Sequence, residues 1–233
     1  IEDFWKDTHL KNGYGLINIP HISKINLWQT SGHLDFYRDY MYSPIEIDKQ
    51  KYIIKPMNCP GHILIYKTKK RSYKDLPIRL SEIGRLNRNE LSGSLGGMFR
   101  VRQLTMDDAH IFCREDQIQE EITKVLSLVN EFYSIFNLKP SFKLATMPEK
   151  ALGDKKTWNS AEKALENSLK ANKLKYEIKE KDGAFYGPKI DIHIKDVLNR
   201  DWQLATIQLD FQMPERFDLS YQGEDSKKHR PVM

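Results

Sequence analysis

The chain has 233 residues, which is enough for one large domain, and 39% of them are hydrophobic, which is enough for a real core. A mean hydropathy of −0.63, with no apolar run near spanning length, excludes an integral membrane protein. Two cysteines, Cys59 and Cys113, exclude a disulfide scaffold and fit a reducing compartment. The net charge of +5 tolerates a polyanionic partner such as RNA without requiring one.

The first part of the chain predicts short elements joined by turns. We expect the end of a helix over 1–10, a strand over 14–19 closed by Pro20, a short helix and turn within 26–42, and a short strand over 51–55. Two prolines then constrain a sharp turn over 56–62, which would present Cys59 with little freedom. A helix is expected to begin at Ile63.

A strand–loop–strand hairpin follows, and its loop is the run 92–97, which is rich in glycine and serine. Arg88 and Glu90 precede this loop and would share one face of the first strand. Arg100 and Arg102 would alternate on the second strand, which runs on to His110. The planar fork of arginine suits the recognition of polyphosphate. Spacing alone leaves another interpretation open, which is a solvated hairpin with ordinary surface charge.

The second half of the chain predicts two amphipathic helices among several strands. The helices are expected over 118–136, with Asp116 as a candidate N-cap, and over 157–172. Strands are expected over 142–145, 176–179, 190–195 and 202–211, with Thr206, Gln208 and Asp210 on one face of the last. Antiparallel strands with interspersed helices predict an α+β fold.

Six strings in this sequence resemble threonyl-tRNA synthetases. They are Met57–His62, Arg88–Ser94, Asp107–Phe112, Gly183–Lys189, Ile207–Phe211 and Tyr221–Asp225, in that order. The resemblance runs from about Gly13 to Met233 without a large gap. It implies the catalytic domain of a class II aminoacyl-tRNA synthetase, an antiparallel β-sheet flanked by helices. Residues 1–233 would form this one domain, lacking the start of the first class II motif and all of the third, so the segment alone is expected to be inactive.

The implied activity is that of a threonine–tRNA ligase. Threonine and ATP would give threonyl-adenylate, and the acyl group would then pass to the 3′ end of tRNA(Thr). Magnesium would accompany ATP. The resemblance also implies a homodimer, with Pro20 at the interface, and no DNA or membrane partner. Because no secretory or transit pattern is visible, a cytoplasmic protein is expected, although an organellar form is not excluded.

The resemblance assigns roles to individual residues. Arg88 would bridge the threonine carboxylate and the α-phosphate, and it forms the catalytic set with His33 and Lys189. Leu104 stands where relatives often carry an aromatic residue that stacks on adenine, and Met106 stands where many carry glutamine, so both contacts are in question. The ATP-binding set is Arg88, Glu90 for the adenine amino group, Phe99 over the nucleotide, Arg100 for the terminal phosphates, Gln203 and Thr206.

Threonine selection is assigned to a zinc ion. Cys59 and His110 match two of its protein ligands, and the third is expected as a histidine just beyond Met233. An open coordination position would take the amino and hydroxyl groups of the substrate. Spacing alone is a weak signal here, and a buried cysteine with a satisfied histidine is the alternative. The threonine-binding set is Met57, Asp108, Tyr186 and Gln208, and Gln203 reaches the same pocket only if a β-bulge is present.

Two residues near the predicted site have no assigned catalytic role, and three rival functions remain open. His62 and Cys113 are interpreted as structural. One rival is a paralogue that has lost aminoacylation, which intact Arg88 and Lys189 argue against. A serine or proline synthetase shares the fold, but proline offers no hydroxyl to the metal that Cys59 and His110 would hold. A zinc-binding interaction protein is the third rival, but it would require a closed site with four ligands.

Overall fold

The computed structural model describes all residues, 1–233, and the chain forms two compact units. The first unit is Ile1–Phe112 with Arg216–His229, and the second is Cys113–Glu215 with Arg230–Met233. The assignment of 1–233 to a single catalytic domain stays a prediction. None of the helices has the length and apolar character needed to cross a membrane. The helices are α1 (Glu2–Lys11), α2 (Ile25–Thr30), α3 (His33–Phe36), α4 (Cys59–Lys67), α5 (Ile118–Ile135), α6 (Lys155–Ala171) and α7 (Gln212–Arg216).

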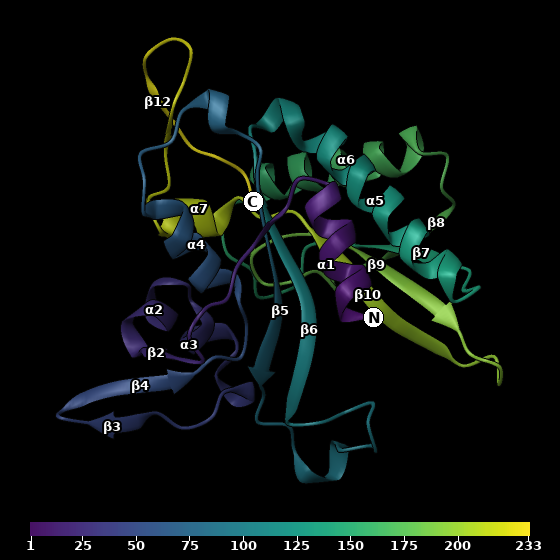
Figure 1. Ribbon diagram of the computed structural model, residues 1–233, viewed down its shortest axis with the longest axis horizontal. Helices are drawn as coiled ribbons and strands as arrows, with labels where there is room; N and C mark the ends of the chain where they lie inside the picture. The colour runs from purple at the N-terminus through teal and green to yellow at the C-terminus, as the bar shows by residue number, and fades with distance from the viewer. The chain divides into compact units, whose positions relative to one another are not determined.

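The first unit is built on a long antiparallel pair, β5 (Ile78–Asn87) and β6 (Gln103–Phe112), which lie side by side in Figure 1. A short strand, β1 (Gly15–Leu16), adds to β5 in parallel. Tyr66 and Phe112 stack on one another in the core of this unit, with ring centroids 4.7 Å apart. The remaining strands of the unit form two small antiparallel sheets, β2 (Ile22–Lys24) with β4 (Gln50–Ile54) and β3 (Ile45–Ile47), and β11 (Tyr221–Gln222) with β12 (Lys228–His229).

The expected hairpin is confirmed, but its strands are shorter than the sequence suggests. The four charged residues Arg88, Glu90, Arg100 and Arg102 lie in the connection between β5 and β6 and not on the strands. The backbone N–H of Arg88 still donates to Arg102 at 2.9 Å, but Glu90 N–H turns back to the carbonyl of Arg88. The ladder therefore stops at this point, and all four charged residues are carried by the connection between the strands.

The helix expected from Ile63 begins earlier, at Cys59. Both Gly61 and His62 donate their backbone N–H to the carbonyl of Asn58, so the turn is already helical. Pro60 lies in the first turn of α4, where a helix tolerates proline because the N–H groups there have no partner in any case. Cys59 is thus presented by the N-terminus of a helix.

The second unit contains a four-stranded sheet in the order β10-β9-β7-β8, against which α6 packs. Its strands are β7 (Ser141–Ala145), β8 (Tyr176–Lys179), β9 (Lys189–Lys195) and β10 (Asp201–Gln208). Only the β7–β8 pair is parallel, so the α+β class with predominantly antiparallel pairing is confirmed. α5 and α6 lie next to one another in Figure 1 and confirm the two expected helices.

The N-cap of α5 and the start of α6 differ from expectation, and the contacts explain both differences. α5 starts at Ile118 as expected, but Gln117 occupies the N-cap position without a side-chain capping hydrogen bond, and Asp116 instead pairs with Arg114 at 2.8 Å. α6 starts two residues before the expected Thr157. Asp154 accepts hydrogen bonds from the backbone N–H groups of Lys156 and Thr157, at 2.8 and 3.0 Å, and so acts as the N-cap.

The β-bulge expected beside Gln203 is confirmed by a register shift between Gln203 and Ala205. Thr206 and Gln208 share a face as expected, but Asp210 does not. It lies beyond the end of β10, where its Oδ1 accepts hydrogen bonds from the N–H groups of Gln212 and Met213 at the start of α7. Asp210 is therefore a buried capping residue of this short helix.

The packing of α6 in the core of the second unit predicts the cost of shortening one of its buried side chains. Leu165 is fully buried on the face of α6 that also carries Leu169, so Leu165→Ala should lower the free energy of unfolding by about 2–5 kcal/mol. The exposed Lys163 on the same helix provides the control, and Lys163→Ala should stay within about 0.5 kcal/mol of the wild type. Urea titration followed by far-ultraviolet circular dichroism makes the comparison. Equal midpoints for the two variants would contradict this packing.

Candidate functional site

The predicted metal ligands Cys59 and His110 both belong to the first unit, on α4 and β6. His62 stands one helical turn after Cys59 on α4 and therefore lies on the same side of that helix. The Nδ1 atoms of His62 and His110 are 2.9 Å apart, and the two rings meet at 70° with centroids separated by 4.5 Å. The first turn of α4 thus lies against the part of β6 that carries His110.

Four buried side chains lie in a continuous line that starts at His110, and we call this line the buried row. It consists of His110, His62, Glu82 and Lys55, with side-chain exposures of 8%, 0%, 3% and 1%. His62 Nε2 lies 3.1 Å from Glu82 Oε2, and Lys55 Nζ lies 3.1 Å from Glu82 Oε1. The backbone N–H of Ile19 also donates to Oε1. Burial raises the pKa of Glu82, but the hydrogen bonds from His62, Ile19 and Lys55 outweigh burial and lower the pKa overall.

Asp108, a predicted threonine contact, is held by Asn58 at the N-cap of α4. Asn58 Nδ2 donates to Asp108 Oδ2 at 2.9 Å, so the carboxylate has a fixed direction. Asn58 fits because Gly84 on β5 carries no side chain, and a Cβ there would overlap the Asn58 amide group. The site thus depends on a glycine that the resemblance did not single out.

Four of the six residues assigned to ATP lie in the connection between β5 and β6, namely Arg88, Glu90, Phe99 and Arg100, and the other two lie on β10. Arg100 and Glu90 form an ion pair, with Arg100 Nη2 at 2.9 Å from Glu90 Oε2. Arg88 is half-buried, and its Nε donates to the carbonyl of Pro56 at 3.4 Å. Arg88 is paired with neither Glu82 nor Glu90, because Lys55 and Arg100 hold those carboxylates. Phe99 is 78% exposed.

His33 and Met57 contact each other in the first unit. His33 Nδ1 lies 2.7 Å from Ser31 Oγ, and its Nε2 lies 3.1 Å from Met57 Sδ. Burial, followed by the positive charge of Arg216, lowers the pKa of His33 to about 4. The ring is therefore neutral at physiological pH and can accept or donate one proton.

The second unit brings together its own predicted residues. The hydroxyl of Tyr186 donates to Gln208 Oε1. Lys189 Nζ lies 2.7 Å from Asp191 Oδ2, while Gln203 Nε2 and Thr206 Oγ1 donate to Asp191 Oδ1 at 2.7 and 3.1 Å. Asp191 is fully buried and holds three of the predicted site residues, yet sequence analysis missed it. The available signal was an acidic residue placed between Ile190 and Ile192 on the predicted strand.

The turn before Lys189 is fixed by close packing. A Cβ at Gly187 would overlap the carbonyl oxygen of Leu209, so only glycine fits there. The N–H of Leu209 also donates to the carbonyl of Pro188 at 3.1 Å. These contacts hold the start of β9 and therefore the base of Lys189.

The chemistry of Cys59 and His110 fits zinc, although they make an incomplete set. Thiolate and neutral imidazole are both zinc ligands. The two cysteines are not joined in a disulfide, and burial lowers the pKa of His110 to about 4, which keeps the imidazole neutral. No group of three or more His, Cys, Asp and Glu side chains in the chain is arranged to hold a metal ion. The site therefore needs a further ligand.

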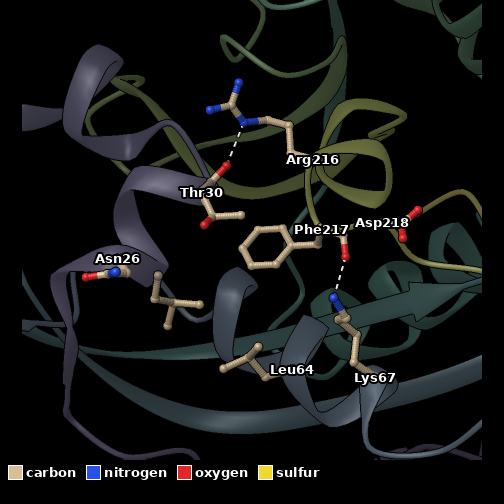
Figure 2. Close-up of a pocket in the computed structure, with 8 residues that line it drawn as sticks. Asn26, Thr30, Leu64, Lys67, Arg216, Phe217 and Asp218 are labelled. Atoms are coloured by element: carbon tan, nitrogen blue, oxygen red, sulfur yellow. Dashed lines mark hydrogen bonds between the residues drawn. The ribbon is translucent and has the colours of Figure 1, made fainter.

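Two cavities lie in the first unit, away from most of these residues. Figure 2 shows the larger one, of about 420 Å³, where Arg216 donates to the carbonyl of Thr30 and Lys67 to that of Phe217. None of the predicted site residues lines it. The smaller cavity, of about 290 Å³, is mostly apolar and is bordered by Lys55 and Met57. Met57 is the predicted site residue that borders one of these two cavities.

Comparison with known proteins places these residues in a family context. The model of the tRNA synthetase class II core domain (G, H, P, S and T) matches residues 41–233. The threonine–tRNA ligase of Magnetococcus marinus is 51% identical over 234 residues, and the chloroplastic/mitochondrial threonine–tRNA ligase 2 of Arabidopsis thaliana is 53% identical over 234. Each match covers 100% of this chain and 36% of the relative. The chain thus spans about a third of the length of these relatives.

A solved structure agrees with these matches. The crystal structure of the RNA binding domain of threonyl-tRNA synthetase from Cryptosporidium parvum superposes with a TM-score of 0.96 at 42% identity. The match covers 99% of this chain and 58% of that one. The expected fold is therefore shown by the sheet pairing and by this similarity together.

The buried state of His33 predicts a pH dependence of stability. Its pKa is about 4 in the folded chain against the ordinary histidine value of 6.5, so the unfolded chain binds more protons between these values. The free energy of unfolding must then fall as pH falls through this window. Between pH 7 and pH 5 the loss from this residue is about 2 kcal/mol. His33→Gln should remove that part of the loss, as measured by urea titration of both proteins at the two pH values. The same pH dependence in variant and wild type would contradict the assignment.

Proposed function

The chain belongs to the family of tRNA synthetase class II core domains, and from this membership we propose that it is the amino-acid-activating part of a threonine–tRNA ligase. The reaction proposed is the attack of the threonine carboxylate on the α-phosphate of ATP, followed by transfer of the threonyl group to the 3′ end of tRNA(Thr). Identity of 51% or more to threonine–tRNA ligases over the whole chain supports threonine over the other amino acids of the family.

The environment of Arg88 is the observation that supports the proposed reaction. It is half-buried, and both neighbouring glutamates are neutralised by other cations. A guanidinium in this state suits an anionic ligand, because its fork can donate to two oxygen atoms at once. Arg88 would hold the threonine carboxylate and the α-phosphate in line and stabilise the charge that develops between them.

Glu90 and Arg100 would exchange partners when ATP binds. In this structure they bind each other at 2.9 Å. The proposed roles, adenine amino group for Glu90 and terminal phosphates for Arg100, require that pair to open. The pair is partly exposed and so costs little to break. Phe99, exposed in the same loop, would then cover the nucleotide, and Mg²⁺ would accompany the phosphates.

Selection of threonine is proposed to depend on zinc held by Cys59, His110 and a third ligand. When bound, zinc supplies open coordination positions to the amino and hydroxyl groups of the amino acid. Asp108, which Asn58 fixes at 2.9 Å, would accept a hydrogen bond from the substrate hydroxyl. Met57 would provide an apolar contact beside these groups, and His33 behind it would assist the transfer step.

The second unit contributes the residues that the resemblance assigns to the amino group and the nucleotide. Tyr186 and Gln208 are paired with each other, which orients both for a substrate amino group. Asp191 holds Lys189, Gln203 and Thr206, and so fixes these three polar groups relative to one another. We further propose a homodimer and a cytoplasmic location; among the relatives, the Arabidopsis protein carries an organellar name.

The role of Arg88 predicts a large kinetic effect. In the full-length protein, Arg88→Ala should lower threonine-dependent exchange of pyrophosphate into ATP by on the order of 100-fold or more, as for loss of a central charge-stabilising donor. Arg88→Lys should not rescue it, because an ammonium cannot span two oxygens on different groups. Arg85→Ala, at an exposed position on β5, is the control and should retain activity. Near-normal exchange by Arg88→Ala would rule out this assignment.

The zinc proposal predicts which amino acids are activated. Valine lacks the hydroxyl and leaves the site unsatisfied, so it should be rejected by about 10⁴-fold or more. Serine offers the same amino and hydroxyl groups and lacks one methyl, which is worth only about 10–200-fold. The full-length protein should therefore activate serine measurably in the exchange assay. Absence of exchange with threonine would refute the proposed function, and serine rejection as strong as that of valine would refute the selection by zinc.

A further inference from the structure

The buried row contains a carboxylate that can only accept hydrogen bonds, and this property decides the direction of every bond in the row. Lys55 Nζ and the backbone N–H of Ile19 both donate to Glu82 Oε1, at 3.1 and 3.3 Å. Glu82 Oε2 then accepts from His62 Nε2 at 3.1 Å. His62 must therefore carry its proton on Nε2.

The next bond in the row follows from the charge balance. Glu82 is already paired with Lys55, so a second cation at His62, which is 0% exposed, would have to share that one carboxylate in a buried site. With a single ring proton, which Nε2 donates to Glu82, His62 can only accept at Nδ1. The Nδ1 atoms of His62 and His110 are 2.9 Å apart, so His110 must donate from Nδ1. A neutral His110 then has its lone pair on Nε2.

We propose that Lys55, Glu82 and His62 are positioning residues that set the tautomer of His110, so that its Nε2 lone pair is available to the zinc ion. The inference depends on the proposed function, since only a metal ligand needs this tautomer. A ligating histidine commonly donates its other ring N–H to a fixed acceptor, which orients the ring and makes it more basic. Here the acceptor is a second histidine, whose own tautomer is set by a carboxylate.

The alternative acceptor for His110 is Asp108, and the geometry disfavours it. Asp108 Oδ1 lies 3.8 Å from His110 Nδ1, beyond hydrogen-bond length, while its Oδ2 accepts from Asn58. His62 is also placed one turn after Cys59 on α4. The residue that sets the tautomer of one proposed ligand thus lies on the same face of the helix as the other, which couples the positions of both.

Glu82→Gln tests this proposal because it should reverse the direction of the hydrogen bonds in the buried row while leaving the side chains in place. Lys55 and the N–H of Ile19 both need an acceptor, so the amide oxygen of Gln would replace Oε1 and its NH₂ would replace Oε2. That NH₂ would donate to His62 Nε2, His62 would donate from Nδ1, and His110 would hold its proton on Nε2. The zinc affinity of the full-length protein, measured by chelator competition, should fall by about 10–100-fold.

The matched control is Glu121→Gln, which removes another buried carboxylate, on α5, and should leave zinc affinity unchanged. Nitrogen-15 NMR of histidine-labelled, metal-free protein reports the tautomers directly. The wild type should show His110 protonated on Nδ1, and Glu82→Gln should show it protonated on Nε2.

The outcomes separate this inference from the proposed function. An affinity of Glu82→Gln within about twofold of the wild type would overturn it, since second-sphere losses are larger. So would a wild-type His110 protonated on Nε2, a result that needs no variant to fold. A wild type with the expected tautomers that binds no zinc would instead overturn the proposed metal and, with it, the role of the row as a positioning device.

Discussion

The neutralisation of Glu82 within the buried row is the interaction on which the first unit depends. This one carboxylate accepts from the segment after β1 through Ile19, from Lys55 after β4 and from His62 on α4, and it stands on β5 itself. Removing one partner of such a buried pair costs about 3–5 kcal/mol, because a charge is left without compensation. The contact of His62 with His110 extends the same chain of bonds to β6. Segments that are distant in sequence therefore meet at one charge.

In the second unit, Asp191 is likewise a buried carboxylate that accepts several hydrogen bonds. This buried carboxylate accepts from Lys189, Gln203 and Thr206, and the β-bulge in β10 makes room for that arrangement. In each unit a buried acidic residue with no proposed substrate contact fixes part of the proposed site. Asp191 holds three predicted site residues directly, and Glu82 is linked to His110 through His62. Catalysis by positioning requires side chains with little freedom, and a buried ionic hydrogen-bond partner restricts them.

Sequence patterns predicted the regular elements well and the local corrections poorly. The apolar periodicity of α5 and α6 and the alternation of β9 were sufficient, because helices and strands of this length have clear periods. The bulge at Gln203 was predictable from the mismatch between its role and simple alternation. Residues 59–62 were expected to form a turn because proline usually interrupts a helix, yet proline is accepted in the first turn. The link from His62 to Glu82 and the role of Asp191 did not follow from the sequence, because a hydrogen-bond partner across the fold leaves only a weak signal in one sequence.

We propose that this chain selects threonine through a metal held by Cys59 and His110. X-ray absorption at the zinc edge of the full-length protein tests it most directly. We predict one sulfur at about 2.3 Å and nitrogen ligands at about 2.0–2.1 Å, with a shell that changes when threonine is added and does not change with valine. Cys59→Ser should remove the sulfur. A wild-type shell without sulfur, or one that responds equally to threonine and valine, would contradict this account.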